Sequence, residues 1–281
     1  MDIRFYRTFW GAKSSFLQFA AEAKADGYDG LEAPVPLDRS KQSELRNALD
    51  EYGFDLIAEI CTAGSYVPER RATPAQHRDD FLRKLEVIHK FGARQINCMA
   101  GCDAWPLNQS IALFDELITL AAQADIPISF ETHRSRTLFT PWVARDMALQ
   151  LPELFFTCDF SHWCVVCERL IDTEDDVLEV IAPRARHIHG RVGYDQGPQV
   201  PHPAAPEYSE ALAAHQRWWE QCWVQMQTAG LRECTLTPEF GPDGYLHHQP
   251  FTDMPVGDLR QINRWMLETE REHFSHWKRG R

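Results

Sequence analysis

The stretch Thr157-Cys158-Asp159-Phe160-Ser161-His162-Trp163 decides the fold. It continues the apolar pair Phe155-Phe156, which is typical of a short buried strand, and it places Asp159 at the strand end with His162 three residues later. Three other strand-like runs also end in a side chain that can bind a metal: residues 127–130 in Glu131, 185–188 in His189, and 233–238 in Glu239. The C-terminal strand ends of a parallel barrel meet at one mouth. The pattern therefore predicts such a barrel, with these four side chains at its mouth.

Strand-like and helix-like segments alternate along the whole chain in eight units, each a strand followed by a helix. The expected strands cover residues 3–6, 28–32, 54–60, 95–101, 127–131, 155–159, 185–189 and 233–239. Eight such units favour a closed (β/α)8 TIM barrel of the α/β class over an open doubly wound sheet. Because no linker, low-complexity segment or repeat interrupts the pattern, residues 1–281 are predicted to form a single domain.

Capping residues mark several expected helix starts. Thr73 with Pro74 and Gln76 forms the clearest one, a capping box with proline in the first turn. Asp258 is expected to cap the last helix, and Asp172 or Thr173 the helix before the seventh strand.

Two segments are candidates for a functional role. Residues 190–206 form a long loop with four prolines on the active-site side of the predicted barrel, and we expect the loop to cover the substrate. The helix expected from about residue 209 to 229 is rich in tryptophan, with Trp218, Trp219 and Trp223 at helical spacing. These three side chains indicate either core or an oligomer surface, so a dimer or tetramer of identical chains is compatible with the sequence.

Composition excludes several classes of protein. The formal net charge is -12 and no basic block stands out, which argues against nucleic acid as the main partner. No run of about 18 apolar residues is present to span a membrane. The eight cysteines are spread out, unlike those of a small disulfide-rich scaffold, and the first residues lack the pattern of a signal peptide. We therefore expect a reduced, cytoplasmic protein.

Two glutamates, one aspartate and one histidine make an oxygen-rich set of ligands. Such a set suits one divalent ion, with Mn²⁺ favoured and Mg²⁺, Co²⁺ or Zn²⁺ as alternatives. A divalent ion would polarise a substrate carbonyl and stabilise the enediolate that forms when the neighbouring C–H is deprotonated. A carboxylate beside the metal can act as the base.

Some of these assignments have a competing interpretation. His187 and His189 are two residues apart and face the same side of a strand, so either could be the ligand. Glu59 also ends a strand, and a salt bridge inside the barrel is at least as good an explanation for it. The lone Cys164-x-x-Cys167 pair is a weak indication of zinc.

Further residues near the mouth are candidate substrate contacts. His133 comes two residues after Glu131 and should face the mouth, and Trp163 could stack on a sugar. Arg134, Arg136 and Arg191 could bind sugar hydroxyls or a phosphate, or they could pair with the acids of the site itself.

At these positions the sequence resembles the xylose isomerase-like TIM-barrel superfamily, and within it the sugar phosphate isomerase/epimerase family. The resemblance covers nearly the whole chain. It implies that Glu131, Asp159, His189 and Glu239 bind the metal and that Glu131 and Glu239 carry protons. It also implies that His162, the histidine of the Asp-x-x-His motif, contacts the sugar. The matching motifs are Phe130-Glu131-Thr132-His133, Asp159-x-x-His162, His187-Ile188-His189 and Pro238-Glu239-Phe240.

The chain departs from the ketose 3-epimerases of that family at two places. Those enzymes carry an arginine six residues after the metal-binding histidine, where this chain has Asp195 and instead has Arg191 two residues after it. The segment 131–136 also differs. The resemblance therefore implies the metal site and leaves the substrate open.

The function predicted from the sequence is a metal-dependent sugar isomerase or epimerase that works on a small carbohydrate through an enediolate. The first alternative is a lyase, dehydratase or hydratase acting on a keto-sugar or inosose. The second alternative is a sugar-binding barrel without turnover. His162, His133, Arg191 and Trp163 are the predicted substrate contacts.

Overall fold

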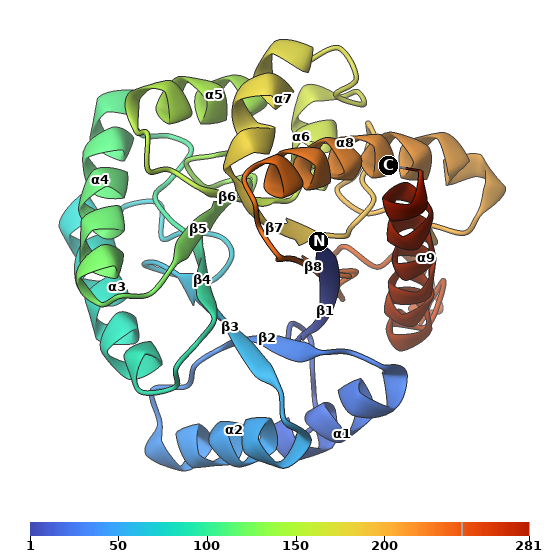
Figure 1. Ribbon diagram of the computed structural model, residues 1–281, viewed down its shortest axis with the longest axis horizontal. Coiled ribbons are helices and arrows are strands. Elements are labelled where there is room, and N and C mark those ends of the chain that lie inside the picture. The colour runs from blue at the N-terminus through green and yellow to red at the C-terminus, as the bar shows by residue number, and fades with distance from the viewer. Residues whose placement is uncertain (243, 281) are drawn as a thin grey trace.

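The computed structural model describes residues 1–242 and 244–280, so the predicted domain of residues 1–281 also includes two positions outside the described part. Eight parallel strands of this part close in sequence order into a barrel (Figure 1). The barrel closes where β1 pairs with β8, with Asp2 opposite Glu233. The predicted (β/α)8 fold is confirmed. The strands are β1 (Asp2–Thr8), β2 (Gly30–Pro34), β3 (Asp55–Cys61), β4 (Gln95–Met99), β5 (Ile128–Glu131), β6 (Phe156–Cys158), β7 (Ala185–His189) and β8 (Glu233–Thr237).

Helices surround the barrel, and the main core lies between them and the strands (Figure 1). Trp218, Trp219 and Trp223 are fully buried there, which confirms the core interpretation of the tryptophan-rich helix. None of the described helices is long and apolar enough to cross a membrane. The helices are α1 (Phe16–Asp26), α2 (Arg39–Tyr52), α3 (Pro74–His89), α4 (Leu107–Gln123), α5 (Pro141–Gln150), α6 (Ser161–Cys167), α7 (Asp175–Ile181), α8 (Ser209–Thr228) and α9 (Leu259–Arg279).

The predicted caps of α3 and α9 are present. Thr73 and Gln76 form the reciprocal hydrogen bonds of a capping box at the start of α3. The Asp258 side chain accepts a hydrogen bond of 2.9 Å from the backbone of Gln261. These local interactions explain why both helix starts could be read from the sequence.

The predicted cap of α7 is wrong. Glu174 holds the N-cap position and makes no side-chain capping bond. The Asp172 carboxylate instead accepts hydrogen bonds from Arg217 and from the indole of Trp218, 3.1 Å away. The Thr173 hydroxyl lies 3.3 Å from a carboxylate oxygen of Glu174. A tertiary contact thus engages Asp172, and a local contact with Glu174 engages Thr173, in place of capping.

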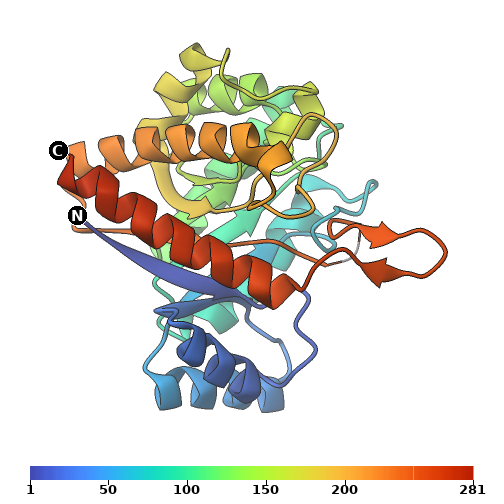
Figure 2. The ribbon, with the colours of Figure 1, turned by 90° about the vertical axis from the view of Figure 1, so that its right-hand side faces the viewer.

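Two short elements were not predicted. Helix α6 begins directly after Asp159 and carries His162 and Trp163. A hairpin of β9 (His248–Gln249) and β10 (Met254–Pro255) follows the eighth strand. Figure 2 shows this hairpin projecting on the side of the barrel away from the N-terminus, where the C-terminal strand ends lie.

The loop 190–206 packs against the segment that follows β8. Gln199 is buried and exchanges two hydrogen bonds with the backbone of Gly241, at 2.8 and 3.3 Å. Val192 and Val200 are fully buried. Within this loop, Arg191 is the residue that lines the central cavity described below. The role of the 190–206 loop in covering a substrate remains a prediction.

Candidate metal centre

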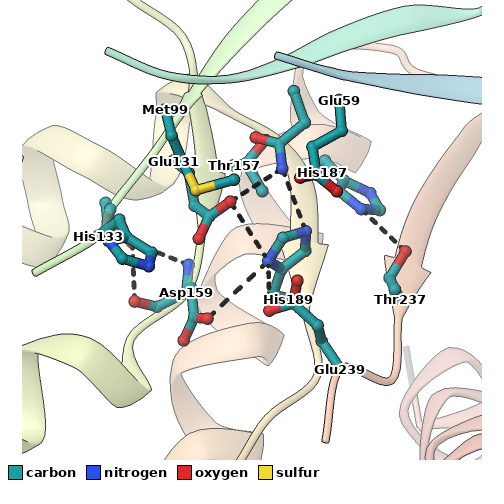
Figure 3. Close-up of polar contacts among 12 residues, drawn as sticks. Glu59, Met99, Glu131, His133, Thr157, Asp159, His187, His189, Thr237 and Glu239 are labelled. Atoms are coloured by element: carbon teal, nitrogen blue, oxygen red, sulfur yellow. Dashed lines mark hydrogen bonds and ion pairs between the residues drawn. The ribbon is translucent and has the colours of Figure 1, made fainter. Parts of the chain in front are cut away.

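The four predicted ligands converge at the mouth of the barrel. Glu131 ends β5, Asp159 follows β6, His189 ends β7 and Glu239 lies two residues beyond β8. One candidate ligand atom from each lies within 4.8 Å of the other three. Figure 3 shows the imidazole of His189 among the three carboxylates. All four side chains are buried.

The His189 ring presents one nitrogen to the carboxylates and the other to a different acid. Its Nδ1 lies 2.9 Å from Glu239 Oε2, 3.7 Å from Glu131 Oε2 and 3.8 Å from Asp159 Oδ2. This buried nitrogen has no partner in hydrogen-bonding geometry. A ring nitrogen without a hydrogen-bond partner, facing three carboxylates, fits the ligand set of a divalent ion such as Mn²⁺, Mg²⁺ or Zn²⁺.

Glu32 orients the His189 ring from the other side. Its Oε1 lies 3.0 Å from His189 Nε2, and its Oε2 lies 3.1 Å from His187 Nε2. Burial opposes ionisation of Glu32, but the two imidazoles outweigh it and hold the pKa of this carboxyl well below its usual value. A carboxylate that accepts from Nε2 leaves Nδ1 free to bind a metal. Glu32 was not among the predicted site residues, although it ends the expected strand 28–32.

His187 lies one layer deeper in the barrel than the ligands. Its Nδ1 is 2.7 Å from Thr235 Oγ1, and its Nε2 contacts Glu32 and, at 3.1 Å, Thr237 Oγ1. Both ring nitrogens therefore have protein partners. Of the two histidines, it is His189 that joins the group of three carboxylates.

Asn97 on β4 connects the two acidic layers, and sequence reasoning also missed it. Its amide donates to Glu32 at 3.0 Å and to Glu131 at 2.9 Å. Despite this bond, burial, together with the charges of Glu239 and Asp159, raises the pKa of Glu131 to about 8. Glu131 can therefore hold a proton near neutral pH when no metal is bound.

Arg191 pairs with the acids of the site and also lines the cavity. Its guanidinium contacts Asp159, lies 3.4 Å from Glu239 Oε2 and donates to Ser161 Oγ at 3.0 Å. Burial of Asp159 opposes its ionisation, but Arg191 and His162 outweigh burial and hold the pKa of Asp159 well below its usual value. Arg191 is thus an internal counter-ion positioned at the cavity surface.

A cavity of about 310 Å³ opens in front of the candidate ligands. Glu131 and Glu239 reach its surface. The rings of Trp10, Tyr66 and Tyr245 also line it, with Trp10 and Tyr245 edge-to-face at 4.9 Å. These aromatics come from loops, where no periodic pattern could have pointed to them.

Gly241 explains how the Trp10 ring packs beside the site. A Cβ atom at this position would lie 1.8 Å from the Trp10 ring, so any other residue would displace the indole. The glycine two residues after Glu239 therefore shapes the cavity wall.

His133 and His162 both lie near the cavity, but only His133 lines it. The His133 Nδ1–H donates to the carbonyl of Arg134, which leaves Nε2 as an acceptor. Burial and the charge of Arg191 lower the pKa of His133 to about 3, so the ring is neutral. His162 is fully buried, its ring centroid lies 4.0 Å from that of His133, and its Nε2 accepts from Arg191 at 2.7 Å.

The structure corrects the interpretation of Trp163. Its indole is fully buried, packs on Phe160 and donates a hydrogen bond of 3.1 Å to the carbonyl of Leu138. Helix α6 turns the side chain into the core, so it does not line the cavity and cannot stack on a sugar there.

Arg134, Arg136 and Glu59 also have defined places. The Arg134 guanidinium lies over the Tyr245 ring. Arg136 is buried and donates to backbone carbonyls, so it is not a rim residue. Glu59 lines the cavity and, among the described residues, makes no salt bridge.

Known protein families include one that agrees with this fold. A family model described as "Xylose isomerase-like TIM barrel" matches residues 20–195. Among curated proteins, none matches the sequence significantly.

Solved structures with the same fold cover almost the whole chain. D-allulose 3-epimerase from Methylomonas sp. in complex with D-allulose has a TM-score of 0.66 at 15% identity, covering 97% of both chains. A xylose isomerase-like TIM-barrel protein from Mycobacterium smegmatis in complex with magnesium has a TM-score of 0.63 at 13% identity, covering 96% of this chain and 97% of that one. The 3-keto-D-glucoside 4-epimerase YcjR from E. coli has a TM-score of 0.59 at 15% identity, covering 96% and 100%.

Other matching structures include the "probable 3-DHS dehydratase" AsbF from Bacillus anthracis, endonuclease IV from Thermus thermophilus and an IolI protein with a bound zinc atom. At 11–12% identity these three share the fold with this chain. The reaction differs among the proteins of this fold, so the reaction of this chain must be argued from its own site.

Proposed function

The chain belongs to the xylose isomerase-like TIM-barrel family, and from that premise we propose that it is a divalent-metal-dependent isomerase or epimerase of a sugar or keto-sugar. One observation carries the proposal: the unpartnered Nδ1 of His189 faces the carboxylates of Glu131, Asp159 and Glu239 beside a cavity. Mn²⁺ is our first choice of metal, with Mg²⁺, Co²⁺ and Zn²⁺ as alternatives. Similar structures that hold magnesium or zinc support a divalent ion.

Glu131, Asp159, His189 and Glu239 would hold the metal, which when bound would polarise a substrate carbonyl and stabilise negative charge on its oxygen. The remaining chemistry falls to side chains of the chain itself. Glu131 and Glu239 both reach the cavity surface, so each can contact a substrate held there.

We assign proton transfer to these two glutamates. One carboxylate takes the proton from the carbon next to the carbonyl, and the C–H electron pair becomes the C=C bond of an enediolate. A proton is then returned to the other face of the same carbon, which gives an epimer, or to the neighbouring carbon, which gives an isomer. The Nε2 of His133 can accept a hydrogen bond from a sugar hydroxyl, and the nearby Arg191 can donate one.

The second candidate function is β-elimination of water from a keto-sugar or inosose, and the departure of segment 131–136 from the ketose 3-epimerases favours it. This reaction starts with the same deprotonation, but the carbanion then expels a hydroxyl group, which leaves as water after taking up a proton. The glutamate that took the proton from carbon could deliver that proton to the leaving hydroxyl. Hydration would run the same steps in reverse.

Proton exchange in D₂O tests the proposal directly. Protein loaded with Mg²⁺, which does not broaden NMR lines, would be incubated with ketoses, keto-sugars and inososes. We expect one C–H signal next to a carbonyl to disappear, and a new sugar spectrum to follow. A vinylic signal would identify elimination instead. Absence of exchange from the whole panel, with metal binding verified, would contradict the proposal.

Substitution of the two glutamates separates an enzyme from a sugar-binding barrel. We expect Glu131→Gln and Glu239→Gln each to lower turnover by about 10²–10⁴-fold, the usual contribution of an acid–base group. Glu179→Gln, the same change at an exposed position of α7, is the matched control and should leave turnover unchanged. Unchanged turnover in both active-site variants would contradict the proton-transfer role. A wild-type protein that binds sugars without turnover would instead be the non-catalytic barrel.

A further inference from the structure

The Glu59 carboxyl group lines the cavity from the half of the barrel that faces the candidate ligands. Those ligands follow β5 to β8, whereas Glu59 lies in β3, opposite Pro34 of β2 and Asn97 of β4 in the sheet register. Cys61, two residues later on the same side of the strand, also lines the cavity. A substrate that contacts the ligands and fills the cavity would therefore reach Glu59.

Glu59 has no cationic partner among the described residues. Its contact within the protein is with the Cys61 thiol, whose Sγ lies 3.6 Å from Oε1, and a thiol is a weak donor. Figure 3 marks no contact between Glu59 and the other residues drawn. Burial, together with the charges of Glu32 and Glu239, raises the pKa of this carboxyl to about 7. A carboxyl group on a cavity wall whose protein contact is a weak thiol donor is placed to receive a stronger hydrogen bond from a ligand.

The cations that line the described cavity are already engaged. The Lys84 ammonium donates to the carbonyl of Cys61 at 2.6 Å and to Asp80 at 2.8 Å. Arg191 pairs with Asp159 and Glu239. Phosphate and carboxylate groups of ligands are normally bound by arginine, lysine or a helix N-terminus. In the described part of the cavity, the charge of each of these cations is already compensated by an acid of the protein, so neither offers an uncompensated charge to a negatively charged substituent.

We propose that Glu59 is a specificity-determining residue that accepts a hydrogen bond from a hydroxyl or ammonium group of the substrate and disfavours phosphorylated and carboxylated substrates. The inference rests on the proposed function, which places a sugar carbonyl at the candidate ligands. The rings of Trp10, Tyr66 and Tyr245 offer apolar surface for the C–H groups of such a sugar. The substrate class is therefore an unphosphorylated keto-sugar, either neutral or amino-substituted.

The test measures binding of three probes with one carbon skeleton to the Mg²⁺-loaded protein, by NMR titration at about pH 8, where Glu59 is ionised. The probes are D-fructose, D-fructose 6-phosphate and 1-amino-1-deoxy-D-fructose. We expect the phosphate to bind at least about tenfold more weakly than fructose, as repulsion between nearby like charges predicts. If the amine binds more tightly than fructose, the partner of Glu59 is an ammonium group. If fructose binds more tightly than the amine, the partner is a hydroxyl group.

Two substitutions isolate the charge of Glu59 from its shape. Glu59→Gln should remove most of the discrimination against the phosphate, whereas Glu59→Asp, which keeps the charge, should preserve it. Glu179→Gln is the control for loss of an acid elsewhere. Metal affinity of Glu59→Gln should equal that of the wild type, because Glu59 is not a ligand, and this equality shows that the variant is folded.

Three outcomes would overturn the inference: a wild type that binds the phosphate as tightly as fructose, discrimination that survives in Glu59→Gln, or a wild type that binds none of the probes. These titrations detect binding without turnover. Loss of the proposed function therefore appears as missing exchange in D₂O with discrimination intact. Failure of the Glu59 assignment alone appears as exchange with no effect of Glu59→Gln.

Discussion

At the scale of single residues, Glu32 decides which nitrogen of His189 faces the carboxylates. Because the Glu32 carboxylate lies 3.0 Å from Nε2, the proton of a neutral ring is held there and the lone pair of Nδ1 points to the site. Replacing the carboxylate with an amide weakens this bond and removes a negative charge that makes the ring a better ligand. The acid beneath the site should therefore affect metal binding without touching the metal.

We expect Glu32→Gln to weaken metal binding by about 10–100-fold, the usual effect of losing an acid that orients a metal-binding histidine. Titration calorimetry with Mn²⁺ or Mg²⁺ measures the change, and Glu179→Gln, at an exposed position, is the matched control. An affinity equal to that of the wild type would show that Glu32 does not position His189.

The clustering of the four candidate ligands could be predicted from the sequence because each one lies at a strand end, and strand ends of a parallel barrel share one mouth. Glu32 ended the expected strand 28–32 but was missed, since that strand is short and its segment showed no other site residue. In the structure Glu32 lies in the middle of β2. Tyr66 and Tyr245 reach the cavity from loops, and their positions depend on tertiary packing that no local pattern encodes. Trp163 was misplaced for a related reason: a helix begins directly after Asp159 and turns the indole inward.

At the scale of elements, Arg136 holds the loop between β3 and α3 in place over the cavity. Its buried guanidinium donates to the backbone carbonyls of Thr62, Ser65, Tyr66 and Gly101. Most of these acceptors belong to the loop that carries Tyr66 to the cavity wall. The arginine thus replaces the hydrogen bonds that an irregular loop cannot make to itself.

We expect Arg136→Met to lower the free energy of unfolding by about 2–4 kcal/mol, because buried carbonyls lose their donors. Hydrogen exchange of residues 62–66 should also become faster than in the wild type. Denaturant unfolding and exchange mass spectrometry measure the two effects. Arg70→Met changes an exposed arginine of the same loop and should alter neither the free energy of unfolding nor the hydrogen exchange of residues 62–66. Wild-type exchange in residues 62–66 of Arg136→Met would contradict the role of the arginine.

The elements differ in how well they could be predicted. Long helices with side-chain caps, such as α3 and α9, follow from local hydrogen bonds. The cap of α7 did not, because Asp172 binds Arg217 and Trp218 of another helix. Helix α6 and the β9–β10 hairpin have seven and four residues in their regular parts, too few to set up a hydrophobic period.

At the scale of the whole molecule, metal binding at the proposed site should be linked to folding, since the four candidate ligands come together only in the closed barrel. The metal-free site also binds protons more tightly than the unfolded chain does. Burial raises the pKa of Glu131 to about 8, and the surrounding carboxylates overcome burial to raise the pKa of His189 well above its usual value. A group whose pKa is raised on folding stabilises the folded state below its unfolded pKa, and this contribution is lost as pH rises through the folded pKa.

The stabilising contributions of Glu131 and His189 to the metal-free protein are therefore lost as pH rises from the unfolded pKa of Glu131, 4.5, towards about 8, with His189 adding to the loss above 6.5. Asp159 and Glu32 have lowered pKa values, so their contributions are complete in the upper part of this window. Buried histidines with lowered pKa values, such as His133, oppose the loss up to about pH 6.5, the unfolded pKa of histidine. Metal binding requires Glu131 and His189 to release their protons, so the stabilising effect of the metal should grow over the same pH range.

Melting curves at pH 6 and pH 8 test this linkage, with EDTA or with Mn²⁺ at one fixed concentration, about hundredfold above its dissociation constant at pH 8. At pH 8 we expect the metal to raise Tm by roughly 5 °C, and at pH 6 by clearly less, because protons compete for Glu131 and His189. Glu239→Gln removes one carboxylate from the ligand set, so its metal-dependent shift should shrink at both values. A shift in the wild type that is larger at pH 6 than at pH 8 would mean that the metal binds elsewhere, since only a site that must lose protons gains affinity as pH rises.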